Sequence, residues 1–257
     1  NSNLKPDWLW IKSRNDADIH VITDSTRGTD LFLSSNNDLG EVSSTADVEA
    51  FGTDGFTVNG PNDRVNTGGG LYVAWQWKAG GGTTSTNNDG AVASTVQVNS
   101  TAGFSILTYT MNSGSNETVG HGLGVAPKIV ITKARERGDS NGFWSFYTTI
   151  IDGSLDYLKL NTEGQKNNSS LSAPTSTVFT GAGSSTASYR IFVAYCFAEV
   201  QGYSKFGSYV GNGNANGTFV YTGFKPAWIM IKKYDTSDDS WVILDNKRNS
   251  TNVVNGR

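Results

Sequence analysis

The sequence predicts an all-β protein built from β-sandwich-like internal repeats, and three observations lead to this fold class. The composition is rich in Gly (30 residues), Ser, Thr and Asn and includes 7 Trp, 10 Tyr and 12 Phe. Gly, Asn and Ser favour turns, whereas Thr, Val and the aromatic residues favour strands. The apolar blocks are short and bounded by Gly, Asn and Ser clusters, which is the pattern of strands. Finally, the blocks repeat along the chain.

The first repeated block occurs three times, as Pro6–Lys12, Pro127–Lys133 and Pro226–Lys232. Its apolar character at nearly every position predicts a strand that is covered on both faces, as in a sandwich interior. The leading proline fits a strand start, where no ladder N–H is needed. The closing lysine is expected to reach water while its stem lies along apolar surface.

Three further blocks also recur along the chain, and each is a short run rich in aromatic or β-branched residues. They are His20–Asp24, Trp144–Tyr147 and Trp241–Asp245; Tyr72–Trp77 and Phe192–Phe197; and Gly103–Tyr109 and Lys205–Tyr209, the last followed by Thr218–Phe224. Self-similarity of this kind indicates a repeat architecture.

The repeats divide the chain into one complete unit flanked by two partial units. We expect a partial unit at 1–79, a linker rich in Gly, Thr and Asn at 80–100, and the complete unit at 101–200. A second partial unit at 201–257 is expected to be tightly coupled to the complete one. The missing unit halves predict either a longer parent protein or partial units that complete one another or a neighbouring chain.

The charge balance excludes a nucleic-acid role. The formal net charge is −3, and phosphate neutralisation requires a basic face. The basic cluster Lys133–Arg137 is interrupted by Glu136 and is expected to be a solvated loop. No apolar run approaches the roughly 18 residues of a membrane span.

The residues that could support catalysis all have simpler interpretations. Cys196 is the single cysteine and lies in an apolar run, which predicts a buried thiol. His20 takes the place of Trp144 and Trp241, so it is expected to pack. His121 lies in a glycine-rich turn; an anion cradle there would need a helix N-terminus, and a strand follows instead. We therefore predict no catalytic, cofactor-binding or metal-binding residues.

The acidic and charged motifs of the chain also indicate no defined catalytic site. Asp152, Asp156 and Glu163 could act as a glycosidase pair, but sequence does not place two of them across a sugar. The duplicated pairs Asp24–Arg27 and Asp245–Arg248 are predicted to be salt bridges or turn caps at strand ends.

Two short motifs carry little weight. The run Asp235–Asp239 lacks the glycine and terminal glutamate of an EF-hand loop. The triplet Arg137–Asp139 matches an integrin-recognition tripeptide, and a polar hairpin is expected there.

Three segments, Gly103–Thr110, Thr118–Pro127 and Tyr195–Tyr209, resemble an uncharacterised domain family of marine bacteriophages. The similarity extends from about Lys5 to Lys247, and members often lie in virion proteins described as tail fibres. The resemblance implies a non-enzymatic structural protein exposed on the virion, in a tail or appendage. The implied partners are other virion proteins, further copies of the chain (a trimer is favoured) and a host surface glycan. The alternatives are a capsid-decorating or head-fibre protein, a carbohydrate-active enzyme and a secreted adhesin.

Overall fold

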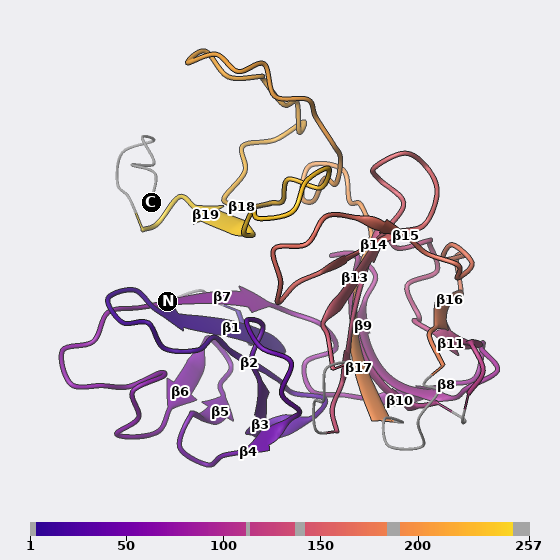
Figure 1. Ribbon diagram of the computed structural model, residues 1–257. Coiled ribbons are helices and arrows are strands. Elements are labelled where there is room, and N and C mark those ends of the chain that lie inside the picture. Colours follow the sequence, from indigo (N-terminus) through magenta and orange to yellow (C-terminus); the bar gives the residue numbers. More distant parts are fainter. Residues whose placement is uncertain (1–3, 112–113, 137–141, 184–190, 249–257) are drawn as a thin grey trace.

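The computed structural model describes residues 4–111, 114–136, 142–183 and 191–248. Within these ranges the chain is all-β, and its named strands pair in an antiparallel manner (Figure 1). The predicted fold class is therefore confirmed. None of the described residues forms a helix long and apolar enough to cross a membrane.

The N-terminal unit contains a five-stranded sheet with the order β4-β3-β2-β1-β7. Its strands are β1 (Trp8–Ser13), β2 (Val21–Asp24), β3 (Gly28–Leu33), β4 (Val42–Ser43) and β7 (Tyr72–Trp77). A hairpin of β5 (Val48–Phe51) and β6 (Phe56–Val58) packs on one face through Val48 and Phe56. The opposite face of the sheet points towards the rest of the molecule.

The central unit contains an eight-stranded sheet with the order β15-β14-β13-β12-β17-β10-β9-β8. Its strands are β8 (Ser85–Asn87), β9 (Ser94–Asn99), β10 (Phe104–Thr110), β12 (Ile129–Ala134), β13 (Ser145–Thr148), β14 (Asp156–Lys159), β15 (Asn167–Asn168) and β17 (Ile191–Phe197). A two-stranded sheet of β11 (Glu117–Gly120) and β16 (Val178–Gly181) covers one face through Val119 and Phe179. This layered arrangement matches the expected sandwich.

The segment 80–100 differs from the expected linker, because it contains β8 and β9. Strand β9 pairs along almost the whole of β10, so this segment belongs to the central sheet. The turn before it is also fixed. The Gly82 N–H donates to Gln97 Oε1 (2.8 Å), and Lys5 Nζ donates to the Gly81 carbonyl (2.9 Å).

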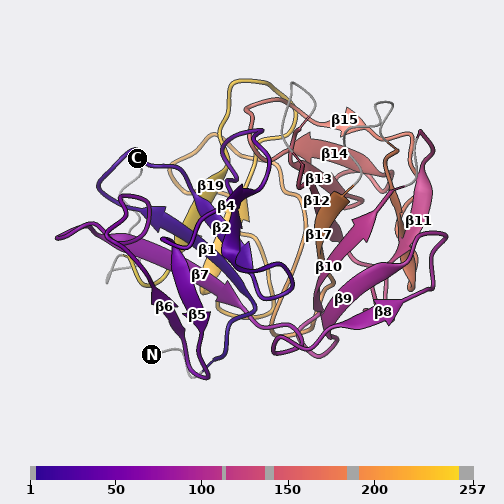
Figure 2. The same ribbon diagram turned by 90° about the horizontal axis from the view of Figure 1, so that it is seen from below.

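The C-terminal unit contributes a two-stranded hairpin of β18 (Trp228–Ile231) and β19 (Val242–Asp245). The described segment before it, 201–227, contains no strand. Figure 2 shows the two large sheets side by side, with the C-terminal segment behind them.

The repeats predicted from the sequence form equivalent hairpins in the same register. Trp8 pairs with Asp24, and Trp228 pairs with Asp245 at the corresponding place. The closing strands β7 and β17 are also equivalent, since each pairs with the strand formed by the first repeated block of its unit, β1 or β12. The hydrogen bond just before each of these strand pairs is also shared. The Asp7 N–H donates to the Trp77 carbonyl, and the Lys128 N–H donates to the Phe197 carbonyl, both at 2.8 Å.

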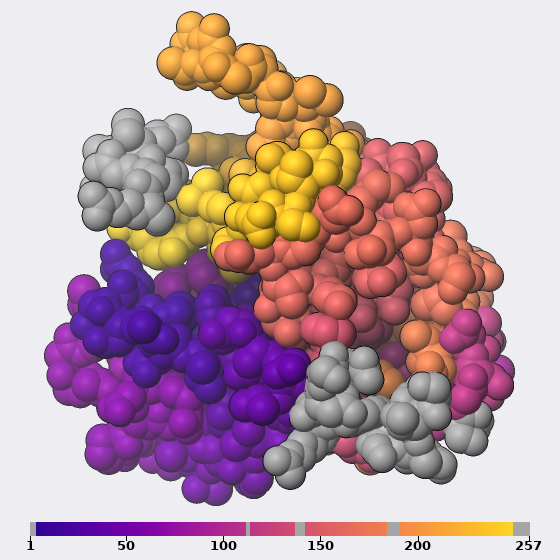
Figure 3. Space-filling model, in the orientation of Figure 1, coloured from indigo at the N-terminus to yellow at the C-terminus, as the bar shows by residue number. Residues whose placement is uncertain are grey.

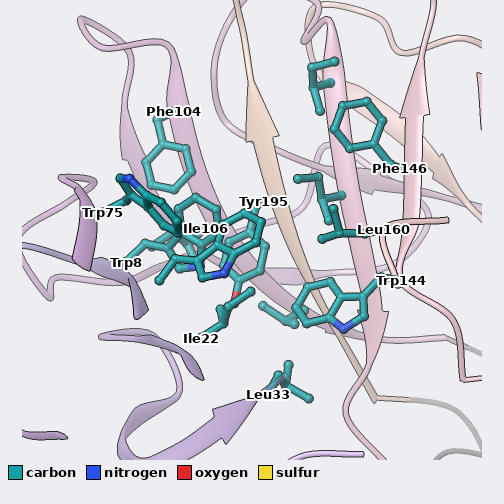
Figure 4. Close-up of a cluster of buried hydrophobic side chains, with 14 of the residues drawn as sticks. Trp8, Ile22, Leu33, Trp75, Phe104, Ile106, Trp144, Phe146, Leu160 and Tyr195 are labelled. Atoms are coloured by element: carbon teal, nitrogen blue, oxygen red, sulfur yellow. The ribbon is translucent and has the colours of Figure 1, made fainter. Parts of the chain in front are cut away.

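One hydrophobic core is shared by all three units, and Figure 4 shows buried side chains that the N-terminal and central units contribute to it. Trp8 and Trp75 of the N-terminal sheet meet Phe104 and Tyr195 of the central sheet. Four apolar side chains of the C-terminal hairpin pack against the same cluster: Trp228, Met230, Trp241 and Ile243. Burial of aromatic surface between the units therefore holds them together as one body.

Lys133 contradicts the expectation that each closing lysine reaches water, and that 133–137 forms a solvated loop. Lys133 and Ala134 belong to β12, and Lys133 is fully buried. Its Nζ donates to the carbonyls of Asp38 (3.2 Å) and Ala134 (3.1 Å). The cause is the docked N-terminal unit, whose loop at Asp38 covers the end of β12.

Candidate functional site

A buried charged turn at the end of β2 is the first part of the candidate site. Asp24 Oδ1 accepts hydrogen bonds from the N–H groups of Thr26 (3.1 Å) and Arg27 (3.0 Å). Arg27 Nε lies 2.5 Å from Asp24 Oδ2, and neither side chain is exposed. The Asp245–Arg248 turn repeats the same contacts, with Nε–Oδ2 again 2.5 Å. Both pairs are therefore turn caps and salt bridges, as the sequence predicted.

The turn at Asp24 also reaches into the central unit. Tyr195 in β17 donates its hydroxyl hydrogen to Asp24 Oδ2 (2.8 Å). Arg27 Nη1 binds Glu41 Oε2 (2.8 Å), and Glu41 Oε1 binds Arg135 Nη2 (2.8 Å). Charges of opposite sign thus alternate along a chain of contacts from one unit to the next.

Three of these groups, Arg27, Glu41 and Tyr195, have shifted pKa values. Burial alone would lower the pKa of Arg27, but Asp24, Tyr195 and Glu41 outweigh it and the pKa lies above its usual value. Burial would raise the pKa of Glu41, but hydrogen bonds and charges from Arg135 and Arg27 lower it. Burial raises the pKa of Tyr195 well above its usual value. None of these groups can therefore exchange a proton near neutral pH, and the arrangement is one that holds units together.

Equivalent contacts recur at the other junctions between units. Trp75 occupies the position of Tyr195 in its own unit, and its Nε1 donates to Asp245 Oδ2 (3.2 Å). The tryptophan that begins the second repeated block also donates a hydrogen bond to a neighbouring unit, in both units that have it. Trp144 Nε1 donates to the Ser34 carbonyl (2.7 Å), and Trp241 Nε1 donates to the carbonyl of Lys159 (3.0 Å).

These bonds run in one direction around the three units. The central unit donates to the N-terminal unit, the N-terminal unit to the C-terminal hairpin, and that hairpin to the central unit. Ser34 and Lys159 occupy equivalent places in the repeat. Ser34 follows Leu33, which pairs with Ile22 in β2. Lys159 follows Leu158, which pairs with Phe146 in β13. These hydrogen bonds therefore connect the three units in a closed cycle around the shared core.

Sequence reasoning found the aspartate–arginine turns but missed Glu41, Arg135 and Tyr195. Glu41 and Arg135 lie outside the repeated blocks, so no pattern marks them. A signal did exist for Tyr195, because an aromatic side chain with a polar hydrogen stands at the same position as Trp75. The recurrence of such a side chain at one position of the repeat is the signal that could have indicated this hydrogen bond.

The histidines and the cysteine lie apart from each other. His20 Nδ1 accepts a hydrogen bond from Trp10 Nε1 (2.7 Å), which is a packing contact of the kind expected. His121 lies in the turn after β11, where its Nδ1 accepts from the Leu123 N–H (3.2 Å). Cys196 is buried, and burial raises the pKa of its thiol to about 12. The thiol therefore stays protonated and unreactive.

The acidic candidates are also engaged by neighbours. Lys166 Nζ binds Asp152 (2.6 Å) and the buried Asp156 (2.9 Å), while Glu163 Oε1 accepts a hydrogen bond from Ser240 Oγ (2.8 Å). In the run 235–239, Asp239 forms an ion pair with Lys233. Within the described ranges no group of three or more His, Cys, Asp or Glu residues is placed to hold a metal ion. The triplet Arg137–Asp139 lies outside the described residues.

A shallow open pocket of about 440 Å³ lies on the central sheet. Thr95, Thr108 and Tyr109 line it together with Arg135, whose guanidinium binds Glu41. Among the described residues that line the pocket, no nucleophile lies beside a base.

A family model described as "Domain of unknown function (DUF7483)" matches residues 1–257. The chain belongs to this family. No curated protein and no solved structure matches the chain significantly. The description of the DUF7483 family specifies no activity.

In this DUF7483 member, Lys133 is expected to make stability rise with pH. Burial lowers its pKa from 10.5 to about 8. Between these values the unfolded chain binds the proton that the folded chain releases, so the free energy of unfolding increases with pH. Urea unfolding across this window should show the increase, by at most about 3 kcal/mol. Lys133→Met should abolish it; equal pH dependence in both proteins would contradict the assignment.

His20 is expected to titrate far below an ordinary histidine. Burial, followed by the charge of Lys12, lowers its pKa from 6.5 to about 4. Its Nδ1 must remain unprotonated to accept from Trp10. The folded state thus binds fewer protons between pH 4 and 6.5, and stability falls as the pH drops through this window. NMR titration of the imidazole tests this, and a midpoint near the ordinary value would refute it.

Proposed function

We propose that this chain is a non-catalytic structural protein of a bacteriophage virion, located in a tail fibre or another exposed appendage. The observation that carries the proposal is that buried polar side chains bind one another between the repeat units. Asp24, Arg27 and Tyr195 bind one another across a junction between repeat units. Groups fixed in this way contribute to rigidity and to the relative placement of units, which is what a mechanical part requires.

Two further features support the proposal. Hydrogen bonds connect the three units in a closed cycle, which holds them in fixed relative positions, as a mechanical part requires. Bacteriophage tail fibres are often trimeric, and we propose that this chain also forms a homo-oligomer, with a trimer favoured. The segment Tyr195–Tyr209, which carries the most specific part of that resemblance, runs from the central strand β17 towards the C-terminal hairpin.

Cryo-electron microscopy of purified virions, with the copy number measured by quantitative mass spectrometry, tests the proposal. Density for this chain in the tail or an appendage, as a small symmetric multimer, is the expected result. Density distributed over the capsid lattice would overturn the appendage location in favour of a decorating protein. Absence of the chain from infectious particles would overturn the structural role itself.

A further inference from the structure

Strand β7 forms an edge of the N-terminal sheet. Its inner edge pairs with β1, and no described strand pairs with its outer edge. The Arg14 N–H donates to the Leu71 carbonyl (2.7 Å), which fixes the alternation along β7. The backbone groups of Tyr72, Ala74 and Gln76 therefore point away from β1. Such an edge can pair with another chain.

The equivalent edge in the central unit is filled. Strand β17, the counterpart of β7, pairs with β12 on one side and with β10 along seven residues on the other. The Ala198 N–H also donates to the Gly103 carbonyl (2.7 Å). The repeat thus shows which kind of strand belongs beside β7: a segment that resembles β10.

A segment of that kind is present in the C-terminal unit and is exposed. Lys205–Tyr209 matches Gly103–Tyr109, which includes most of β10. We call residues 207–224 the arm; Figure 3 shows it projecting from the body in orange. Val210 is 82% exposed, Phe219 85% and Tyr221 78%, in contrast to the largely buried β10. Exposed apolar side chains gathered on one projecting segment indicate a surface for a partner.

We propose that the arm of one copy of this chain pairs with the outer edge of β7 in a second copy. The register of β10 on β17 places Ser208 opposite Trp75 and Val210 opposite Val73. Phe206 stays in its own core, where its ring lies 6.4 Å from that of Phe197. The added strand is therefore Gly207–Gly211.

The arm's own contacts favour a second copy over its own chain. Asn212 Nδ2 donates to the Asn216 carbonyl (2.8 Å), and Thr218 Oγ1 donates to the carbonyl of Val210 (2.8 Å). These bonds shape the arm as a loop that points away from the N-terminal sheet (Figure 1). A second molecule can receive the loop without disturbing the packing of Trp228 on Trp77 (5.4 Å between ring centroids).

A polar atom on β7 provides an independent indication. Gln76 Oε1 is buried and accepts no hydrogen bond from any described residue. An unsatisfied buried acceptor costs free energy, about 1–3 kcal/mol. In the proposed register Tyr209 lies opposite Ala74 and is the diagonal neighbour of Gln76, so its hydroxyl can supply the missing donor. The contact is head-to-tail, and such contacts lead to rings or open filaments.

The test is the oligomeric state of the full chain by analytical ultracentrifugation over a range of concentrations. Wild type is expected to self-associate. Ala74→Pro removes an outward N–H, which edge strands tolerate, and should leave the protein monomeric. Tyr209→Pro in the arm should do the same, because the Tyr209 N–H faces Ala74 in the proposed register. Asn214→Ala, in the arm but outside the added strand, is the matched control and should associate like wild type.

Mixing the two proline variants gives the decisive result. The first retains an intact arm and the second an intact β7, so a 1:1 mixture should form a heterodimer, whereas neither variant associates alone. Circular dichroism melting shows whether each variant is folded. The proposal is overturned if wild type is monomeric throughout, or if the folded Ala74→Pro variant associates as wild type does.

Discussion

Arg27→Met is expected to lower the free energy of unfolding by about 3–5 kcal/mol, because it leaves a buried charge without its partner. Asp24 and Arg27 are both completely buried, and Arg27 also binds Glu41 at 2.8 Å. Without the guanidinium, the carboxylate of Asp24 keeps only the hydroxyl of Tyr195 and backbone N–H groups. Urea unfolding followed by tryptophan fluorescence measures the loss.

The repeat provides a matched control in the same chain. Arg248 makes the same Nε contact to Asp245, but its side chain is 30% exposed. Solvent screens that pair, so Arg248→Met should cost no more than about 1 kcal/mol. Equal losses at the two positions would contradict the claim that burial at the junction, and not the local turn, determines the energy.

The hairpins could be predicted from the sequence because their determinants are local. Each first block places an apolar run between a proline and a lysine, and each second block ends in a turn. The Asp24–Arg27 pair was found because the same residues recur at Asp245–Arg248. Packing of one unit on another has no such periodicity, so the burial of Lys133 under the loop at Asp38 could not be inferred.

The expected linker at 80–100 shows where composition fails. Gly81 and Gly82 have positive φ values of 71° and 89°, so the glycines form a turn that other residues rarely adopt. The Ser, Thr and Asn residues after them suit a flexible segment as well as an edge strand. The segment forms strand β9 because β10 lies beside it and pairs with all six of its residues.

The three units also show how equivalent positions diverge when their neighbours differ. His20, Trp144 and Trp241 occupy one place in the repeat, but only the two indoles donate across a junction. His20 instead accepts a hydrogen bond from Trp10 within its own unit. The N-terminal unit therefore uses Trp75, on its closing strand, to reach its neighbour. Repetition in the sequence predicts the backbone, while the contacts between units depend on each side chain.

Trp8→Ala is expected to lower the free energy of unfolding by about 3–5 kcal/mol, which is the usual cost of removing a buried Trp. Trp8 is 2% exposed and lies at the centre of the shared core. Its indole contacts five aromatic rings of two units: Trp10, Trp77, Phe104, Tyr195 and Phe197. The cavity left behind would therefore weaken the strands and the junction together.

Two companion variants separate packing from hydrogen bonding. Trp8 Nε1 is buried and donates to no described atom, so Trp8→Phe removes an unsatisfied donor and should cost less than half as much as the alanine variant. Trp228 holds the same place in the C-terminal hairpin, is only partly buried and has one ring contact, to Trp77, among the described residues. Trp228→Ala should therefore be milder than Trp8→Ala. Equal losses of unfolding free energy for Trp228→Ala and Trp8→Ala would contradict this expectation. The C-terminal hairpin would then be as essential to the shared core as the N-terminal sheet.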